Sequence, residues 1–209
     1  MTTIDSATGW CEICKTLYSP DFPADRRLHS QLHDEYVNGV KWPGYKNENI
    51  LYFKGESRIV RIDDWSKQCM RNRAAKVGRR GNSETEYDCG IYSSSELGPI
   101  LLIGIIKQRA ISILVLREIN EIWAGNWEDI KPGPVPDNEI TQVYGMLGCS
   151  YYWMLKNYRG TKMVKKMIEC AETIACNSNK TLPLRPPLTK LGENFFKKCY
   201  PTNVTFFLS

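Results

Sequence analysis

The only two histidines of this 209-residue chain, His29 and His33, follow a Cys-x2-Cys pair formed by Cys11 and Cys14. The four residues make the array Cys-x2-Cys-x14-His-x3-His. Zinc prefers thiolate and imidazole ligands in a tetrahedron, and histidines four positions apart share one face of a helix. The array therefore predicts a structural zinc site with Cys11, Cys14, His29 and His33 as ligands. The alternative, a surface Cys-x2-Cys beside two solvated histidines, requires the only histidines to have this offset by chance.

The composition is typical of a globular protein, with 42% hydrophobic and 24% charged residues. The longest apolar run, Pro99 to Ile106, has the length of a strand and falls well short of the roughly 20 residues that a membrane helix needs. We therefore expect no membrane association. The N-terminus lacks the basic flank and apolar core of a secretory leader. The six cysteines outside the array form no repeating framework, so we expect buried thiols in a reducing compartment.

The net charge of +5 is concentrated in two basic stretches, at residues 67–80 and 156–166. Either stretch could face nucleic acid. For the first we favour a solvated helix face, because no aromatic residues alternate with its charges. For the second, the alternative is a phosphate-binding loop. A single finger rarely suffices for specific DNA binding, so direct DNA contact is possible but not predicted.

The chain divides into a small module and a larger domain. We predict a disordered tail over residues 1–9, a C2H2-type zinc finger over residues 10–40 and one domain over residues 41–209. Within the finger, Asp21 or Asp25 would cap a helix that carries both histidines and ends near residue 37.

Turn residues and alternating apolar residues outline the first part of the larger domain. We expect, in order, a hairpin of strands 49–53 and 57–62, a helix over 64–77 capped by Asp63 or Asp64, a loop over 77–84, strands over 86–92, 99–106 and 110–117, and a proline-rich loop over 129–138. The proline-rich loop is the best candidate for an insertion that contacts a substrate or partner.

The second half of the larger domain has a pattern that suits anion binding. Residues 142–155 are apolar and rich in aromatics, as in a central strand, and a basic turn follows them directly. A helix is expected over residues 160–177, because apolar residues recur there at helical spacing. A turn between a strand and a helix presents free backbone N–H groups, which bind phosphate. The sequence predicts either a pyrophosphate site here or a plain connection.

Three segments resemble the cohesin acetyltransferases, also called the establishment-of-cohesion family, a zinc-finger-bearing branch of the GNAT N-acetyltransferases. GVKWPGYKNENIL (Gly39 to Leu51) is similar to the family's extension after the second histidine. CSYYWMLKNYRGTKMVKKMIEC (Cys149 to Cys170) resembles its central strand and acetyl-CoA loop without a gap. The tail LTKLGENFFKKCYPTNVTFFLS, from Leu188, resembles its final helix and strand, and is the least specific of the three.

The resemblance implies an α/β GNAT acetyltransferase fold with an N-terminal C2H2-type zinc finger packed on it. Acetyl-CoA would lie where the fourth strand splays from the fifth, with its pyrophosphate on the loop before the helix. The residues that the resemblance assigns to acetyl-CoA binding are Trp153, Leu155, Arg159, Gly160, Thr161, Lys162, Met163 and Val164.

Ser150 and Glu169 match the family's strand serine and helix glutamate, which the resemblance makes catalytic. The family's third group, an aspartate, is absent, because Pro187 stands at the expected position. Either another carboxylate, such as Glu169 or one in the 128–139 loop, accepts the proton, or the protein binds without turnover. From the residues alone, Ser150 could satisfy a backbone group, and Glu169 could pair with a lysine one turn before it on the helix.

The resemblance implies an acetyl-CoA-dependent lysine N-acetyltransferase with acetyl-CoA and zinc as its ligands. Its substrate would be the SMC ATPase-head subunit of cohesin, its role sister-chromatid cohesion, its partners chromatin-associated proteins, and its location the nucleus. One alternative is a catalytically impaired GNAT-fold zinc-finger protein that acts as a chromatin or protein-binding adaptor. Another is an enzyme that the proline-rich loop directs to a different protein or to a small amine.

Overall fold

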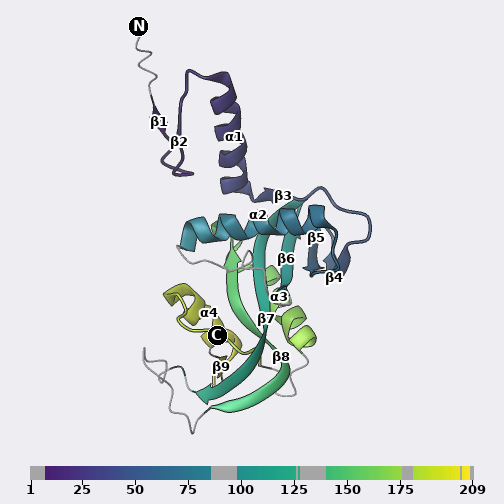
Figure 1. The fold of residues 1–209 in the computed structure, drawn as a ribbon. Helices are drawn as coiled ribbons and strands as arrows, with labels where there is room; N and C mark the ends of the chain where they lie inside the picture. Colours follow the sequence, from purple (N-terminus) through teal and green to yellow (C-terminus); the bar gives the residue numbers. More distant parts are fainter. Residues whose placement is uncertain are drawn as a thin grey trace.

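The computed structural model describes residues 8–85, 98–125, 127, 140–175, 181–202 and 204–207. Within these residues the chain forms a two-stranded finger sheet and a seven-stranded antiparallel sheet with helices on both faces (Figure 1). The finger consists of β1 (Gly9–Trp10), β2 (Leu17–Tyr18) and α1 (Pro23–Asn38). The larger sheet consists of β3 (Val40–Lys41), β4 (Asn49–Lys54), β5 (Ser57–Ile62), β6 (Ile100–Ile106), β7 (Arg109–Gly125), β8 (Thr141–Met154) and β9 (Val204–Phe207). The further helices are α2 (Gln68–Thr85), the short 3-10 helix η2 (Lys156–Tyr158), α3 (Lys162–Ala175) and α4 (Lys190–Cys199).

The sheet runs in the order β3-β7-β6-β5-β4, and both β8 and β9 pair with β7. The predicted hairpins are present, and Lys107 and Gln108 form the β6–β7 turn with φ of 48° and 60°. Two consecutive residues with positive φ match the tight turns whose twist suits a hairpin. The predicted strand 110–117 is only the first half of β7, which continues with β8 as a long curved arm (Figure 1). The predicted strand 86–92 lies outside the described residues.

Helix α2 covers one face of the sheet, and its length corrects the prediction of a loop over residues 77–84. Gly78 and Gly81, which lie in this predicted loop, are both buried within α2. A Cβ at Gly81 would lie 2.4 Å from Tyr151 Oη and 3.0 Å from Trp153 Cγ. The missing side chain therefore lets the helix lie directly on two aromatic side chains of β8.

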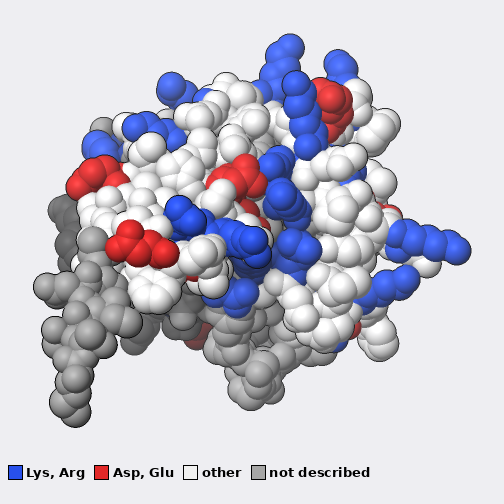
Figure 2. Space-filling model, turned by 90° about the horizontal axis from the view of Figure 1, so that it is seen from above, with Lys and Arg blue, Asp and Glu red and all other residues white. Residues whose placement is uncertain are grey.

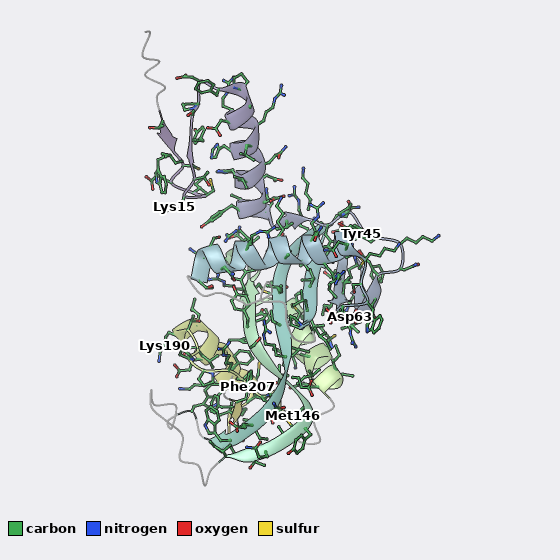
Figure 3. The ribbon with its side chains drawn as sticks, viewed as in Figure 1. Lys15, Tyr45, Asp63, Met146, Lys190 and Phe207 are labelled. Carbon is green, nitrogen blue, oxygen red and sulfur yellow. The ribbon has the colours of Figure 1, made fainter. Side chains whose placement is uncertain are left out.

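Helix α3 packs on the opposite face of the sheet. Its Met167 accepts a hydrogen bond at Sδ from Ser112 Oγ of β7 at 2.9 Å. A Cβ at Gly104 would lie 2.2 Å from the same Ser112 Oγ and 3.0 Å from Met167 Sδ. A third close approach occurs in the β7–β8 arm, where Phe207 of β9, labelled in Figure 3, fills the space above Gly148.

Among the described residues, the finger meets the larger domain at the C-terminal end of α1 (Figure 1). No residue of α1 is buried. Arg109 of β7 holds Asp34 through two hydrogen bonds of 2.7 and 3.1 Å, and Lys76 of α2 donates to Glu35 at 2.7 Å. Charged contacts therefore fix the orientation of the finger.

The predicted aspartate caps are wrong for both helices. Helix α1 begins after Phe22, with Pro23 in its first turn, and Asp25 instead accepts a hydrogen bond from the backbone of Ser19. Proline suits this position because its fixed φ is helical and its missing N–H is not needed there. Asp63 forms a turn with Ser66 before α2 begins.

The predicted boundaries of the tail, the finger and the larger domain stay predictions. Residues 1–7 of the predicted tail and the loop 129–138 lie outside the described residues, while Gly9 already belongs to β1. None of the helices in the described part of the chain has the length and apolar character required to cross a membrane.

Candidate functional site

The four predicted zinc ligands lie together at the finger. Their ligand atoms are all within 4.8 Å of one another, with Cys11 Sγ 3.3 Å from His33 Nδ1 and Cys14 Sγ 3.4 Å from His29 Nε2. Zinc–ligand bonds of 2.0 to 2.3 Å in a tetrahedron place neighbouring ligand atoms roughly 3.3 to 3.8 Å apart. Two thiols and two imidazoles at this separation fit zinc.

The surroundings of these ligands favour the metal-binding form. The backbone N–H of Cys14 is the main cause that lowers the pKa of the Cys11 thiol to about 6. A lower pKa increases the thiolate fraction, and the thiolate is the form that binds metal. Tyr18 stacks on the His29 ring, with ring centroids 3.8 Å apart and planes 11° apart. The stack restricts the rotation of that imidazole.

The strands of the larger sheet separate at Ser150. Just before it, Cys149 forms a parallel bridge with Leu184, and its backbone N–H donates to Pro183 O at 2.7 Å. The backbone N–H of Arg185 donates in turn to Cys149 O at 3.1 Å. Beyond this point β8 has no strand partner among the described residues on its side away from β7. The edge of β8 is therefore open from Ser150 onward, as the resemblance implied for the cofactor cleft.

A cavity of about 260 Å³ occupies this opening. Ser150 lies on one side of it and Pro187 on the other, and Thr85 at the end of α2 and Phe196 of α4 also border it. Ser150 is 8% exposed and donates to Val115 O at 3.4 Å, so its hydroxyl is held loosely at the cavity wall. Ser150 thus borders the cavity, and its catalytic role stays a prediction.

Glu169, the second predicted catalytic residue, is not among the residues that line this cavity. It lies on α3, where Lys166 one turn earlier donates to it. No Asp or Glu of the described residues lines the cavity. Glu169 is therefore not part of the cavity wall that Ser150 borders, and its catalytic role stays a prediction.

The predicted phosphate-binding turn connects β8 to α3. Leu155 and η2 lead to Arg159 and then to Gly160, which has a φ of +79°. Helix α3 begins at Lys162, two residues later than predicted. The first N–H groups of a helix have no partner within the helix and favour an anion. Thr161, the residue before α3, donates from Oγ1 to Tyr158 O at 2.8 Å.

Four of the predicted cofactor-binding residues have buried side chains. Trp153 is 2%, Leu155 3%, Met163 5% and Val164 4% exposed. Trp153 lies under α2, and Met163 lies close to Gly104 of β6. These side chains belong to the core, so contacts with a cofactor would come from their backbone atoms. Arg159, Gly160, Thr161 and Lys162 are exposed.

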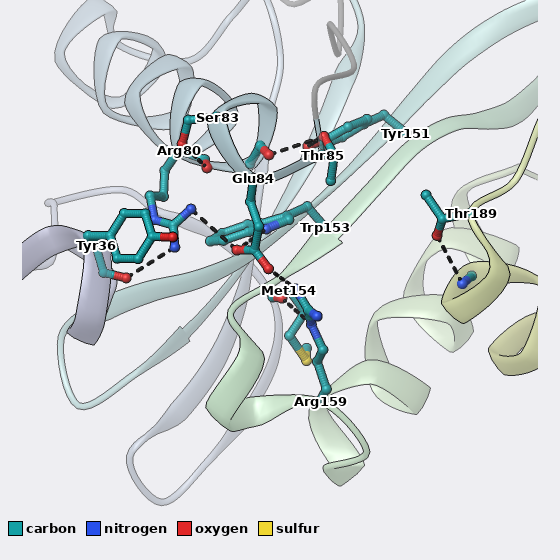
Figure 4. A network of polar contacts seen from close by, with 12 residues as sticks. Tyr36, Arg80, Ser83, Glu84, Thr85, Tyr151, Trp153, Met154, Arg159 and Thr189 are labelled. Atoms are coloured by element: carbon teal, nitrogen blue, oxygen red, sulfur yellow. Dashed lines mark hydrogen bonds and ion pairs between the residues drawn. The ribbon is translucent and has the colours of Figure 1, made fainter. Parts of the chain in front are cut away.

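Glu84 binds Arg159, a contact that no sequence pattern predicts. Arg159 donates from Nη2 to Glu84 Oε1, and from Nε to Met154 O at 3.0 Å (Figure 4). Trp153 Nε1 donates to Glu84 Oε2 at 3.1 Å, and Arg80 forms an ion pair with the same oxygen at 3.3 Å. Glu84 was predicted to lie in a loop, and its partner is 75 residues away in the chain.

The first basic stretch lies along α2 and the turn before it. Lys76 pairs with Glu35, Arg80 with Glu84, and Arg71 donates to Gln68 at 2.6 Å. The predicted solvated helix face describes only part of this stretch, because the Arg80 side chain is 10% exposed. Seen from above in Figure 2, Lys and Arg predominate over Asp and Glu, so this face of the molecule is positively charged.

The sequence is related to the ESCO N-acetyltransferases, although a scan against protein-family models finds no match. It is 24% identical over 113 residues to N-acetyltransferase ESCO2 of Danio rerio, which covers 54% of this chain and 19% of that protein. It is 35% identical over 52 residues to N-acetyltransferase ESCO1 of Mus musculus, which covers 25% of this chain and 6% of that protein. The chain thus spans about a fifth or less of these curated relatives.

The fold matches two solved structures of the xEco2 acetyltransferase domain. The first has a TM-score of 0.60 at 12% identity, covering 79% of this chain and 99% of that chain. The second, described as bound to a K105-CoA conjugate, has a TM-score of 0.58 at 12% identity, covering 78% of this chain and 99% of that chain. The predicted α/β acetyltransferase fold and the resemblance to the cohesin acetyltransferases are confirmed.

Proposed function

We propose that this protein, a relative of the ESCO N-acetyltransferases, transfers an acetyl group from acetyl-CoA to a lysine side chain. The observation that carries the proposal is the opening between β8 and residues 184–189, which holds the Ser150 cavity and lies in a chain with the xEco2 acetyltransferase fold. One solved xEco2 domain is described as bound to a K105-CoA conjugate. A bound CoA thioester would supply the activated acetyl group.

The phosphates of acetyl-CoA would bind at the turn before α3. Backbone N–H groups in the first turn of α3 and the guanidinium of Arg159 would be the anion-binding groups there. The exposed ammonium of Lys162 adds to the positive field. The edge of β8 that faces away from β7, from Ser150 to Tyr152, would pair with the pantetheine arm, because this edge has no strand partner among the described residues.

The reaction requires a neutral amine, since a lysine ammonium has no lone pair for attack. Ser150 Oγ borders the cavity and can accept a hydrogen bond from the attacking nitrogen while it donates to Val115 O. The proton would pass through water to a carboxylate outside the described cavity wall. Glu169 is the candidate that the family resemblance names.

The acceptor in this proposal is the SMC ATPase-head subunit of cohesin, and the setting is nuclear chromatin. The support is the sequence relationship to ESCO1 and ESCO2 together with the zinc finger attached to the same fold. Chromatin-associated proteins would be its further partners.

The test is acetyl-CoA binding by calorimetry, followed by release of free CoA in the presence of a cohesin SMC head domain. We expect binding, CoA release that depends on the SMC head, and a mass increase of one acetyl group on a lysine. Ser150→Ala should lower kcat, and Glu56→Gln, at an exposed hairpin turn, is the matched surface control for Glu169→Gln. Binding without CoA release, unaffected by Glu169→Gln, would contradict the enzymatic function.

A second candidate function is that of a non-catalytic adaptor with this fold. The observation in its favour is that no Asp or Glu of the described residues lines the cavity, where Pro187 replaces the acid of the family. An adaptor would retain CoA or SMC-head binding and release no CoA with any lysine substrate. The same assay therefore distinguishes the two functions.

A further inference from the structure

The carboxylate of Glu84 lies between two guanidinium groups and one indole N–H. Oε1 accepts from Arg159 Nη2, while Oε2 accepts from Trp153 Nε1 at 3.1 Å and pairs with Arg80 Nη1 at 3.3 Å (Figure 4). The Glu84 side chain is 22% exposed, and that of Arg80 is 10% exposed. A carboxylate this enclosed needs its partners, so its position is determined by the three residues around it.

The second anchor of Arg159 is the backbone of β8. Its Nε donates to Met154 O at 3.0 Å, while Nη2 donates to Glu84. A guanidinium has five N–H groups, so these two contacts leave both N–H groups of Nη1 and one of Nη2 for another acceptor. The Arg159 side chain is still 36% exposed. The guanidinium is thus fixed in orientation and keeps donors available at the turn before α3.

Arg80 connects this cluster to the finger. Its Nη2 donates to Tyr36 O of α1 at 3.2 Å, and its guanidinium lies 3.7 Å from the centre of the Tyr36 ring. Burial lowers the pKa of Arg80, and the nearby Glu84 carboxylate opposes that shift. Glu84 therefore compensates a buried charge and orients an exposed one at the same time.

We propose that Glu84 is a positioning residue that holds the Arg159 guanidinium in the orientation that binds the pyrophosphate of CoA. The inference rests on the proposed function, since it assumes that the turn before α3 binds CoA. Glu84 itself touches no ligand. Its contribution is preorganisation: an arginine already immobilised loses less side-chain entropy on binding phosphate.

The direction in which Glu84→Gln changes the affinity for CoA distinguishes a positioning role from a purely electrostatic one. Removing the negative charge of Glu84 would make the turn more positive and strengthen phosphate binding if charge alone decided. If orientation decides, the same change weakens binding. Because the entropic cost of ordering one long side chain is modest, we expect the dissociation constant for CoA to rise about threefold to tenfold.

The experiment uses an Arg80→Met background, because Glu84→Gln alone would leave the buried Arg80 without its counter-charge. Three variants are made in that background: Glu84→Gln, Arg159→Gln and both together. Calorimetry with CoA gives the dissociation constants, and thermal unfolding shows that each variant is folded. Pantetheine, which lacks the pyrophosphate, serves as the matched ligand in competition with CoA.

We expect Glu84→Gln to weaken CoA binding when Arg159 is present, to add nothing when Arg159 is already replaced, and to leave pantetheine binding unchanged. An unchanged or tighter CoA affinity in Glu84→Gln would overturn the proposal. Equal weakening with and without Arg159 would also overturn it, because the role of Glu84 would then be purely structural. Absence of CoA binding by the wild-type protein would instead contradict the proposed function itself.

Discussion

Asp34 of the finger helix and Arg109 of β7 form a two-point ion pair, with Arg109 Nη1 and Nη2 donating to the two carboxylate oxygens at 2.7 and 3.1 Å. Arg109 Nη1 also donates to Gly39 O at 3.2 Å. One arginine thus binds both the last turn of α1 and the residue that ends it. Because no residue of α1 is buried, this pair is a principal link between the finger and the larger domain.

Replacing Asp34 with Asn should loosen the attachment of the finger. The two side chains are 31% and 25% exposed, so we expect a loss of only about 1 kcal/mol, the upper end for a partly exposed pair. Amide exchange in residues 35–42 should then become about fivefold faster, since 1.4 kcal/mol corresponds to tenfold. Asp21→Asn makes the same chemical change at an exposed position of the finger and serves as the control. Equal exchange rates in the two variants would contradict the assignment.

The same pair should make the attachment of the finger sensitive to acid. The hydrogen bonds from Arg109 are the main cause that lowers the pKa of Asp34 below its usual value. A carboxylate with a lowered pKa stabilises the folded state fully above its unfolded value, and this stabilisation is lost as the pH falls through the folded value. Exchange in residues 35–42 should therefore be constant from about pH 5 to 8 and increase below about pH 4, after correction for intrinsic rates. Carboxyl titration by NMR should give Asp34 a higher pKa in Arg109→Gln than in the wild type, and a wild-type value that is not lowered would refute the prediction.

The elements that the sequence predicted correctly have a periodic or local pattern. The zinc ligands follow from a spacing in one segment, and β8 and α3 follow from apolar runs of strand and helix type. Residues 77–84 were wrongly predicted to be a loop, because Gly78 and Gly81 are weak helix formers in isolation. Packing decides here, since Gly81 allows α2 to approach Tyr151 and Trp153.

The contacts that complete the site join distant residues and have no local pattern. Glu84 meets Arg159 across 75 residues of sequence, and Arg109 meets Asp34 across the same separation. From the sequence alone, Glu84 could lie on any solvated helix face. Only the folded sheet brings Trp153 and Arg159 next to it. Ser150 likewise has no local pattern that marks it as a site residue. It was named a catalytic candidate only through the family resemblance, which carries information on tertiary structure.

Removal of zinc should unfold the finger and leave the larger domain folded. The β1–β2 hairpin has two residues in each strand, and α1 has no buried residue, so the finger lacks a hydrophobic core of its own. Small modules of this kind depend on the metal for folding. With a strong chelator, amide protection should be lost over residues 8–33 and retained in β6 and β7, and adding zinc should restore it. Persistent protection of α1 in metal-free protein would show that the helix does not need zinc.

Cysteine labelling should distinguish an exposed from a buried thiol. Burial raises the pKa of Cys149 to about 12, while Cys69 is exposed at the start of α2. Since the thiolate is the reactive form, iodoacetamide at pH 8 should modify Cys69 and leave Cys149 unmodified in the native protein. Both should react in urea, which controls for intrinsic reactivity. Peptide mass spectrometry measures the modified fractions, and rapid labelling of native Cys149 would mean that the β8 edge opens in solution.

Replacing Gly104 with Ala should destabilise the contact between the sheet and α3. The new Cβ would lie 2.2 Å from Ser112 Oγ, a distance at which atoms must move, and 3.0 Å from Met167 Sδ. Ser112 is fully buried, so its hydroxyl has little freedom to shift, and overpacking of this kind costs about 1 to 3 kcal/mol. Urea unfolding of Gly104→Ala should show this loss.

The matched test is the double variant Gly104→Ala with Ser112→Ala. Ser112→Ala removes the oxygen that the new methyl group meets, together with its hydrogen bond to Met167 Sδ. If the clash is the cause, the double variant should be more stable than the sum of the two single losses predicts, with a coupling energy of about 1 kcal/mol. Strictly additive losses would mean that the sheet adjusts at Gly104 without involving Ser112. The packing of β6 and β7 against α3 would then be able to shift, contrary to the close contacts of these two residues.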